Sequence, residues 1–188
     1  VVGPEAPLAE GIVDHFQTMG IPIFGPTRQA AQIEASKAFA KELMQKYGIP
    51  CARSVSFSEY SQAKGYIEQQ TPPIVIKADG LAAGKGVTVA SSIPQALDVL
   101  SSIMELKTLG AAGDRVVIEE YLSGREMSAF AFTDSKTVVP MVSACDYKRI
   151  YDGDQGANTG GMGSYSPPHF HTPELDRMVT ETIMKPAV

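Results

Sequence analysis

The sequence is poor in cysteine, and Cys51 and Cys145 are the only two among its 188 residues. They lie far apart and have no metal-type spacing, which excludes a disulfide-stabilised scaffold and fits a reduced intracellular protein. Long apolar runs are also missing, and no stretch resembles a signal peptide or is long enough to span a bilayer. These absences predict a cytoplasmic location and no membrane partner.

Net positive charge is absent as well, because the formal net charge is −5 at pH 7. Without an overall positive field to attract a polyanion, general binding to nucleic acid or to anionic membranes is not expected. An anionic ligand must instead be met by a local group of donors. With 44% hydrophobic and 20% charged residues, the chain is able to bury a sizeable core as one domain or two small ones.

The most informative segment is glycine-rich and covers residues 73–89. It places Gly80, Gly84 and Gly86 between two short β-branched runs, with Lys77 inside the first run. Glycines let backbone N–H groups approach an anion, and a lysine in an apolar strand needs an anionic partner to offset its desolvation. The segment predicts a phosphate-holding hairpin in which Lys77 is the principal residue. An ordinary flexible hairpin is the alternative.

Two common phosphate-binding loops are excluded by the spacing of the glycines. A Walker A loop has four residues between its first two glycines and a Ser or Thr that holds magnesium, whereas here three residues separate Gly80 from Gly84 and a glycine stands at position 86. A Rossmann loop is followed by a helix, but residues 87–90 have strand composition. A lid comparable to the glycine loop of protein kinases remains.

The periodicity of apolar residues predicts α/β structure at the start of the chain and α+β structure afterwards. Helices are expected over residues 8–20, 27–47 with a break near Ser36, 58–69, 93–105, and from Thr172 onward. Strands are expected over residues 21–24, 53–57, on both sides of the glycine loop, over 115–119, and in a hairpin within 126–141. Domain boundaries are expected near residues 52 and 122.

Two further segments carry polar groups suited to small ligands. Glu119 and Glu120 follow a buried strand, where a carboxylate is able to accept hydrogen bonds from ribose hydroxyls, and solvated glutamates are the alternative. Lys148 and Arg149 precede a glycine run, and these groups suit phosphate or carboxylate oxygens. An idle surface loop is the alternative for that second segment.

Five segments, in order, resemble the ATP-grasp superfamily and, within it, the glycinamide ribonucleotide synthetase (phosphoribosylamine-glycine ligase) family. They are residues 2–8, 24–27, 36–39, 76–86 and 158–163, which read VGPEAPL, FGPT, SKAF, IKADGLAAGKG and NTGGMG. The resemblance covers essentially the whole chain and implies an ATP-grasp fold with ATP held between two α+β subdomains. It implies the end of an N-terminal α/β domain with a linker helix over residues 1–51, a lid subdomain over 52–121 and the first part of the central subdomain over 122–188.

The resemblance also implies functions for individual residues. Lys37 and Lys77 are expected on the ATP phosphates, the main chain of residues 119–122 on adenine, and Glu126 on the ribose. The residues implied to bind ATP are Lys37, Lys77, Gly80, Gly84, Lys85, Gly86, Glu119, Glu120, Tyr121, Leu122 and Glu126. Those implied to face glycine and the ribose phosphate are Asp146, Lys148, Arg149, Asn158, Thr159, Gly160, Gly161, Met162 and Gly163, with Lys77 and Arg149 as the catalytic candidates.

The implied reaction joins glycine to 5-phosphoribosylamine, with ATP converted to ADP and phosphate, in de novo purine synthesis. ATP phosphorylates the glycine carboxylate, and the amine then attacks glycyl phosphate. Both steps gather negative charge, which lysines, an arginine, backbone amides and Mg²⁺ or Mn²⁺ neutralise. The alternatives are another ATP-grasp carboxylate-amine ligase, a nucleotide-binding module without catalysis, and a structural α/β domain.

The chain departs from the family pattern next to the charged residues that are implied to face the substrates. Cys145 and Tyr147 stand where the family usually has Gln and His. The charged members of the motif, Asp146, Lys148 and Arg149, are kept. Their expected roles are therefore carried over, whereas those of positions 145 and 147 are not.

No metal site is expected within the chain. His169 and His171 lack a third ligand nearby and are expected to be solvated loop histidines. The Glu and Asn that hold magnesium in the family do not occur as a motif, because Asn158 is the only asparagine. The absent initiator methionine and the strand-like start further lead us to expect a piece of a larger enzyme, with its metal ligands beyond Val188.

Overall fold

The computed structural model describes residues 1–82, 84–153 and 155–188, apart from the side chains of residues 157 and 158. The chain divides into two compact units. The first comprises residues 1–43 and 52–121, and the second comprises residues 44–51 and 122–188. The division into segments 1–51, 52–121 and 122–188 stays a prediction.

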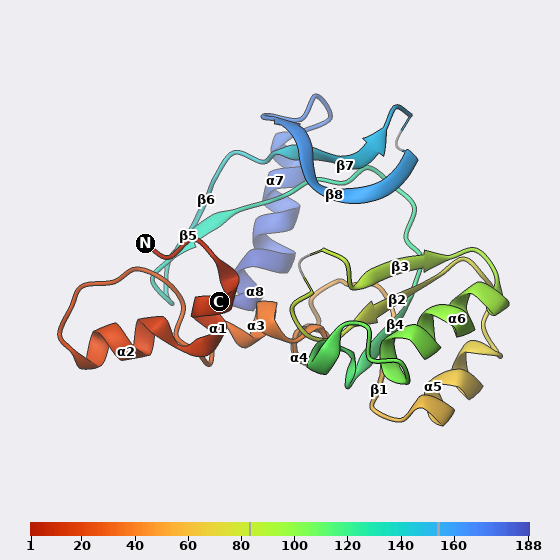
Figure 1. Ribbon diagram of the computed structural model, residues 1–188. Helices are drawn as coiled ribbons and strands as arrows, with labels where there is room; N and C mark the ends of the chain where they lie inside the picture. The colour runs from red at the N-terminus through yellow and green to blue at the C-terminus, as the bar shows by residue number, and fades with distance from the viewer. Residues whose placement is uncertain (83, 154) are drawn as a thin grey trace. The chain divides into compact units, whose positions relative to one another are not determined.

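The first unit is built on a four-stranded sheet with the order β1-β4-β2-β3 (Figure 1). Its strands are β1 (Ser54–Phe57), β2 (Ile74–Ala78), β3 (Val87–Ala90) and β4 (Val116–Glu120). Every pairing in this sheet is antiparallel. Strands β2 and β3 pair from Ile74–Ala90 to Lys77–Val87, so the predicted hairpin around the glycine loop is confirmed.

Two helices, α5 (Tyr60–Ile67) and α6 (Ile93–Met104), pack on one face of this sheet (Figure 1). Side chains alternate between the two faces of a strand, so Ile74 and Ile76 of β2 both point toward these helices, where they join Leu100 of α6 in the buried core. The Ser92 hydroxyl caps α6 by accepting a hydrogen bond from the Gln95 N–H at 3.4 Å. Helix α6 therefore packs against the predicted strand-loop-strand segment and forms a buried core with it.

The opposite face of the sheet carries the other set of alternating side chains. Val75 on β2 lies directly across from Glu119 on β4, and Lys77 lies across from Val117. Lys77 and Glu119 are therefore diagonal neighbours on one face, at a spacing that long side chains bridge. This face carries the charged groups of the candidate site.

Short helices precede the sheet: α1 (Glu5–Glu10), α2 (Ile12–Thr18), α3 (Gln32–Ala35) and α4 (Lys37–Lys46). The single helix predicted over residues 8–20 is wrong, because Gly11 adopts a φ of 92° and separates α1 from α2. The strand predicted over 21–24 is also wrong, since the hydrogen bond from the Val2 N–H to the Phe24 carbonyl, 3.3 Å, is not continued into a ladder among the described residues. The predicted break at Ser36 is confirmed by its extended backbone, with φ −135° and ψ 114°.

The second unit contains two antiparallel hairpins and a helical segment. Strand β5 (Ala131–Thr133) pairs with β6 (Val138–Pro140), and β7 (Cys145–Tyr151) pairs with β8 (Gln155–Tyr165). The helical segment consists of α7 (Pro173–Val179), the π-helical turn η2 (Thr180–Met184) and α8 (Lys185–Ala187). The Thr172 hydroxyl caps α7 by accepting from the Leu175 N–H at 3.2 Å, as the sequence predicts.

The two hairpins differ from the sequence-based expectation in opposite ways. The first is shorter than predicted, because its ladder covers residues 131–133 and an isolated bridge joins Ser128 to Ala144 outside that ladder. The second hairpin forms in the segment that contains Lys148, Arg149 and the glycine run. The sequence predicts a binding segment there, with an idle surface loop as the alternative, and does not predict a paired strand. Its glycine-rich strand has low strand propensity, and pairing with β7 overrides that preference.

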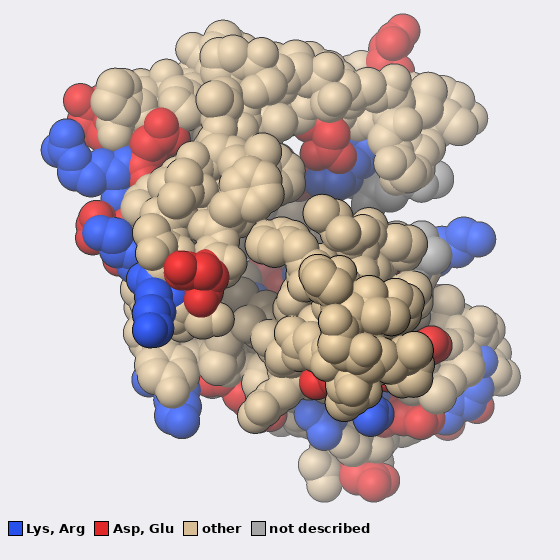
Figure 2. All heavy atoms as spheres, turned by 90° about the vertical axis from the view of Figure 1, so that its left-hand side faces the viewer, with Lys and Arg blue, Asp and Glu red and all other residues tan. Residues whose placement is uncertain are grey.

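The surface carries charges of both signs. On the face shown in Figure 2, acidic and basic side chains are interspersed among other residues. This distribution agrees with the modest net charge of −5 and leaves the binding of an anion to local groups of donors. None of the helices formed by the described residues has both the length and the apolar character needed to cross a membrane.

Candidate functional site

A part-buried ion pair lies on the face of the four-stranded sheet that is opposite to α5 and α6. The Lys77 Nζ is 2.7 Å from the Glu119 Oε2, and the two side chains are 26% and 5% exposed. Both residues are predicted members of the ATP site, and the structure brings them together. The anionic partner that a lysine in an apolar strand requires is here Glu119, so any phosphate bound by Lys77 would share that lysine with a protein carboxylate.

A second lysine, which sequence reasoning missed, approaches the same carboxylate. The Lys41 Nζ lies 3.2 Å from the Glu119 Oε1 and donates a hydrogen bond to the Ala52 carbonyl at 3.2 Å. Within the described residues the Glu119 Oε1 is buried without a hydrogen bond, so Lys41 acts on it as a nearby charge. The available signal is the spacing from Lys37, because residues four apart share one face of a helix.

Lys37 is the first residue of α4 and is fixed to the start of the glycine loop. Its Nζ donates to the carbonyl oxygens of Asp79 at 3.3 Å and Gly80 at 3.1 Å. Burial lowers the pKa of Lys37, and this effect exceeds the opposite effect of Asp79. The ammonium of Lys77 also lowers the pKa of Lys37, so the two lysines predicted to meet phosphates are electrostatic neighbours. An anion bound between them would offset the desolvation of Lys37.

Asp79 organises the junction between α4 and the glycine loop. Its Oδ1 accepts hydrogen bonds from the Ala38 N–H at 2.7 Å and from the Ser36 hydroxyl at 3.0 Å. The Ser36 oxygen in turn accepts from the Phe39 N–H at 3.1 Å. A carboxylate at a helix N-terminus satisfies free N–H groups and favours the helix dipole. Asp79, which is not a predicted site residue, is therefore a cap supplied from outside the helix.

The glycine loop after Asp79 has contacts with the rest of its unit. The Gly80 N–H donates to the Ala112 carbonyl at 3.3 Å, and the Gly86 carbonyl accepts from the Ala78 N–H at 2.8 Å. Gly84 adopts a φ of 77°, which favours glycine. Lys85 is exposed, and Ala83, in the middle of the loop, lies outside the described residues. Closure of this loop over a nucleotide stays a prediction.

We expect Gly80→Ala to reduce the free energy of unfolding by about 1–3 kcal/mol, as overpacking does. A Cβ at position 80 would lie 2.9 Å from the Ala112 Cα, a backbone atom that is not free to rotate away. Urea denaturation of the variant measures this loss. The matched control is Gly65→Ala inside α5, where a Cβ would meet nothing within 4 Å and should increase stability by about 0.5–1 kcal/mol. Equal stability of both variants would contradict the proposed close contact.

The end of β4 contains the residues predicted to contact adenine and ribose. Glu120 accepts hydrogen bonds from the Arg53 backbone N–H and from the Arg53 Nε, each at 2.8 Å. Hydrogen bonding from the Arg53 side chain lowers the pKa of Glu120. Tyr121 and Leu122 are 46% and 64% exposed. Glu120 therefore already has a protein partner, and a ribose would compete with Arg53 for it.

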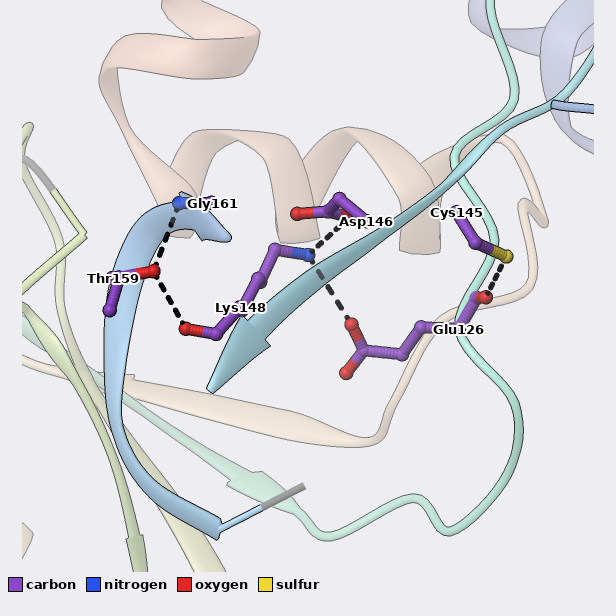
Figure 3. Close-up of polar contacts among 6 residues, drawn as sticks. All are labelled: Glu126, Cys145, Asp146, Lys148, Thr159 and Gly161. Carbon is purple, nitrogen blue, oxygen red and sulfur yellow. Dashed lines mark hydrogen bonds and ion pairs between the residues drawn. The ribbon is translucent and has the colours of Figure 1, made fainter. Parts of the chain in front are cut away.

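The second unit brings three predicted residues together, one lysine and two carboxylates that lie beside its ammonium group. The Lys148 Nζ lies 3.2 Å from the Asp146 Oδ1 and 3.3 Å from the Glu126 Oε2, as Figure 3 shows. Desolvation lowers the pKa of Lys148, but the hydrogen bonds to Asp146 and Glu126 outweigh it, and the net shift is upward. The residue predicted on ribose and two residues predicted on substrates thus share one polar cluster.

The predicted glycine run forms the strand opposite this cluster. The Thr159 hydroxyl donates to the Lys148 carbonyl at 2.9 Å and accepts from the Gly161 N–H at 3.0 Å, which ties β8 to β7 (Figure 3). Gly161 has a φ of 124°, and Gly160 and Gly163 lie in the same strand. The side chain of Asn158 lies outside the described residues.

Arg149, the second catalytic candidate, lies at the far end of this hairpin. Its Nη1 donates to the Gly156 carbonyl at 2.6 Å. Arg149 and Met162 line a surface hollow of about 630 Å³ together with Tyr147 and Tyr151. A small polar ligand fits a hollow of that size, and the lining contains the guanidinium of Arg149 and the carboxylate of Asp152.

The two histidines of the Pro-rich segment have different surroundings. The prediction that His171 is a solvated loop histidine is wrong, because its side chain is 19% exposed and its Nε2 lies 2.8 Å from the Asp176 Oδ2. His169 is exposed and stacks on Tyr165, with a centroid distance of 6.3 Å. Among the described residues, no three His, Cys, Asp or Glu side chains form a group that could hold a metal ion.

The chain is similar to one family of known proteins along its whole length. The sequence profile of the phosphoribosylglycinamide synthetase ATP-grasp (A) domain matches residues 35–188, and that of the N domain matches residues 1–34. The phosphoribosylamine–glycine ligase of Nostoc sp. is 54% identical over 100% of the chain, and that of Halalkalibacterium halodurans is 52% identical over 99%. The chain spans 44% of the length of each relative.

A solved structure extends the similarity from sequence to fold. The crystal structure of phosphoribosylamine–glycine ligase from Thermotoga maritima matches with a TM-score of 0.80 and 38% identity. The match covers 87% of this chain and 42% of that chain. The predicted ATP-grasp fold and the resemblance of the motifs are confirmed. The chain belongs to the phosphoribosylglycinamide synthetase family, and residues 35–188 are part of its ATP-grasp domain.

Proposed function

We propose that the full-length protein containing this chain joins glycine to 5-phosphoribosylamine, with ATP converted to ADP and phosphate, to give glycinamide ribonucleotide for purine synthesis. The observation that carries this proposal is the identity of about half of all residues, along the entire chain, with phosphoribosylamine–glycine ligases. The lysines around the glycine loop and the polar cluster of the β7–β8 hairpin support it with chemistry suited to anionic substrates.

The reaction needs two transfers because a carboxylate is a poor acyl donor. First, a glycine carboxylate oxygen forms a bond to the γ-phosphorus of ATP, and the bond to ADP breaks, which gives glycyl phosphate. Second, the nitrogen of phosphoribosylamine forms a bond to the carbonyl carbon, phosphate leaves with the electrons of the broken C–O bond, and the nitrogen loses a proton. Positioning and neutralisation of charge dominate such transfers.

We assign the phosphates of ATP to Lys37 and Lys77. Both ammonium groups are part-buried, and they lie close enough for Lys77 to lower the pKa of Lys37. Charged donors held in place before the reaction act most strongly where water is excluded. The described residues include no cluster suited to a metal ion, so no step is assigned to magnesium or manganese.

We assign glycine and the ribose phosphate to the β7–β8 hairpin. Asp146 and Lys148 offer one acceptor and one cation, and their mutual distance of 3.2 Å keeps both oriented. An amino acid carries one group of each sign, so a carboxylate beside an ammonium suits it. Arg149, at the hollow formed with Tyr147 and Met162, suits a phosphate group.

A reconstituted reaction with the full-length protein tests this function. Phosphate release from ATP is measured with glycine and 5-phosphoribosylamine together, with each omitted, and with D-alanine in place of glycine. Release that requires both glycine and 5-phosphoribosylamine supports the proposal. If phosphate release is unchanged without 5-phosphoribosylamine, or is faster with D-alanine than with glycine, the protein is a different carboxylate-amine ligase.

A further inference from the structure

Glu119 is a buried acidic side chain of the first unit, and two lysines lie within ion-pair distance of it. Its side chain is 5% exposed, with the Lys77 Nζ at 2.7 Å from Oε2 and the Lys41 Nζ at 3.2 Å from Oε1. A single exposed charge is tolerated in water, but a buried carboxylate that loses its only cation is costly. One lysine is enough to neutralise the single negative charge of Glu119, so the second lysine needs another explanation.

We propose that Lys41 is a positioning residue, which neutralises Glu119 so that Lys77 is able to turn from this carboxylate to a polyphosphate. Lys41 does not itself bind the nucleotide. This inference rests on the proposed binding of ATP, and it adds a residue that acts through Glu119 and Lys77.

The exposure of the two lysines determines which of them is released. The Lys77 side chain is 26% exposed and that of Lys41 is 14% exposed, so Lys77 is more accessible to a ligand. Lys41 is also held by its hydrogen bond to the Ala52 carbonyl at 3.2 Å. When a phosphate attracts Lys77, Lys41 remains beside the carboxylate and compensates its charge.

The buried Oε1 of Glu119 supports this division of roles. It makes no hydrogen bond within the described part of the chain, although Lys41 is at ion-pair distance. The Lys41 Nζ is already 3.2 Å from this oxygen, so a cation remains beside the carboxylate when Lys77 is withdrawn from Oε2. Glu119 thereby exchanges its main partner without becoming unpaired.

The experiment compares nucleotides that differ only in phosphates. Calorimetry with the full-length protein measures the Kd of the non-hydrolysable ATP analogue AMP-PNP and of adenosine. For Lys41→Met, we expect AMP-PNP to bind about ten-fold more weakly, a coupling typical of residues in one ion-pair network, while adenosine binds as in wild type. The matched control is Lys46→Met, which removes an exposed lysine from the same helix and should change neither Kd.

Further variants distinguish the proposed positioning role of Lys41 from a general loss of structure. Lys41→Arg keeps the charge and should retain wild-type affinity for AMP-PNP, whereas Lys41→Gln should lose it. In the double variant Lys41→Met with Glu119→Gln, no buried carboxylate remains to hold Lys77, so most of the affinity for AMP-PNP should return. A residue that only packs against its neighbours would not be rescued by removing a carboxylate.

The possible outcomes distinguish a failure of the inference about Lys41 from a failure of the proposed function. Absence of AMP-PNP binding to the wild-type protein would overturn the proposed function. If the wild type binds but Lys41→Met binds AMP-PNP equally well, or loses adenosine to the same degree, the role of Lys41 is refuted and the function stands. A double variant as weak as Lys41→Met would refute it as well.

Discussion

Lys77→Met in the full-length protein is expected to lower kcat/KM of the proposed reaction by about 10²–10³-fold, the loss seen when one preorganised donor is removed from a developing negative charge. The Lys77 ammonium is 26% exposed and lies at the start of the glycine loop, where the phosphates of ATP are proposed to bind. Methionine keeps most of the apolar stem, so the change removes the charge and leaves the packing. Steady-state kinetics with ATP varied at saturating glycine and 5-phosphoribosylamine measure the effect.

The protein should remain folded in this variant, because Glu119 keeps Lys41 at 3.2 Å as a cation. Lys107→Met is the matched control: it removes a lysine from an ion pair with Asp114 in which the side chains are 44% and 68% exposed. Exposed pairs contribute little, so this control should keep wild-type kinetics. Wild-type turnover together with unchanged ATP affinity in Lys77→Met would rule out its proposed role.

The parts of the fold that depend on neighbours in sequence could be predicted. The β2–β3 hairpin follows from two β-branched runs on either side of a glycine loop. Helix α6 follows from an apolar stripe after a serine cap, with Pro94 in the first turn. The break at Ser36 is similarly local, because a serine side chain that caps the following helix is easily recognised.

The parts that depend on tertiary contacts could not be predicted. Lys77 was recognisable as a lysine in need of an anion, but Glu119 is separated from it in sequence and meets it only through the pairing of β2 with β4. Lys41 reaches the same carboxylate from a helix. Strand β8 could not be predicted for another reason. Its glycines have low strand propensity, and the strand forms because it pairs with β7.

The same limit applies to the residues of the candidate site. The family resemblance implies most of them, and the structure groups Lys37 with Lys77, and Glu126 with Asp146 and Lys148. The resemblance does not imply that Glu120 is bound by Arg53, because that contact depends on the edge of the sheet. Nor does it point to Asp79, whose partners come from a helix about forty residues earlier.

Asp79→Ala is expected to lower the free energy of unfolding by about 2 kcal/mol, since it removes a charged acceptor from two part-buried donors. The carboxylate binds the Ala38 N–H at 2.7 Å and the Ser36 hydroxyl at 3.0 Å, so its loss leaves the first turn of α4 without this cap. Urea denaturation measures the loss. Asp114→Ala is the matched control, because its exposed ion pair with Lys107 should contribute little.

Hydrogen exchange of the α4 amides distinguishes a lost cap from a general weakening of the unit. In Asp79→Ala, the Ala38 amide should exchange faster than amides of α6, which lies on the other face of the sheet from the candidate site. Asp79→Asn keeps one oxygen acceptor and should show a smaller loss. The Ser36→Ala and Asp79→Ala changes should be non-additive, because both remove one shared hydrogen bond. Additive losses with uniform exchange would show that Asp79 does not act as the cap of α4.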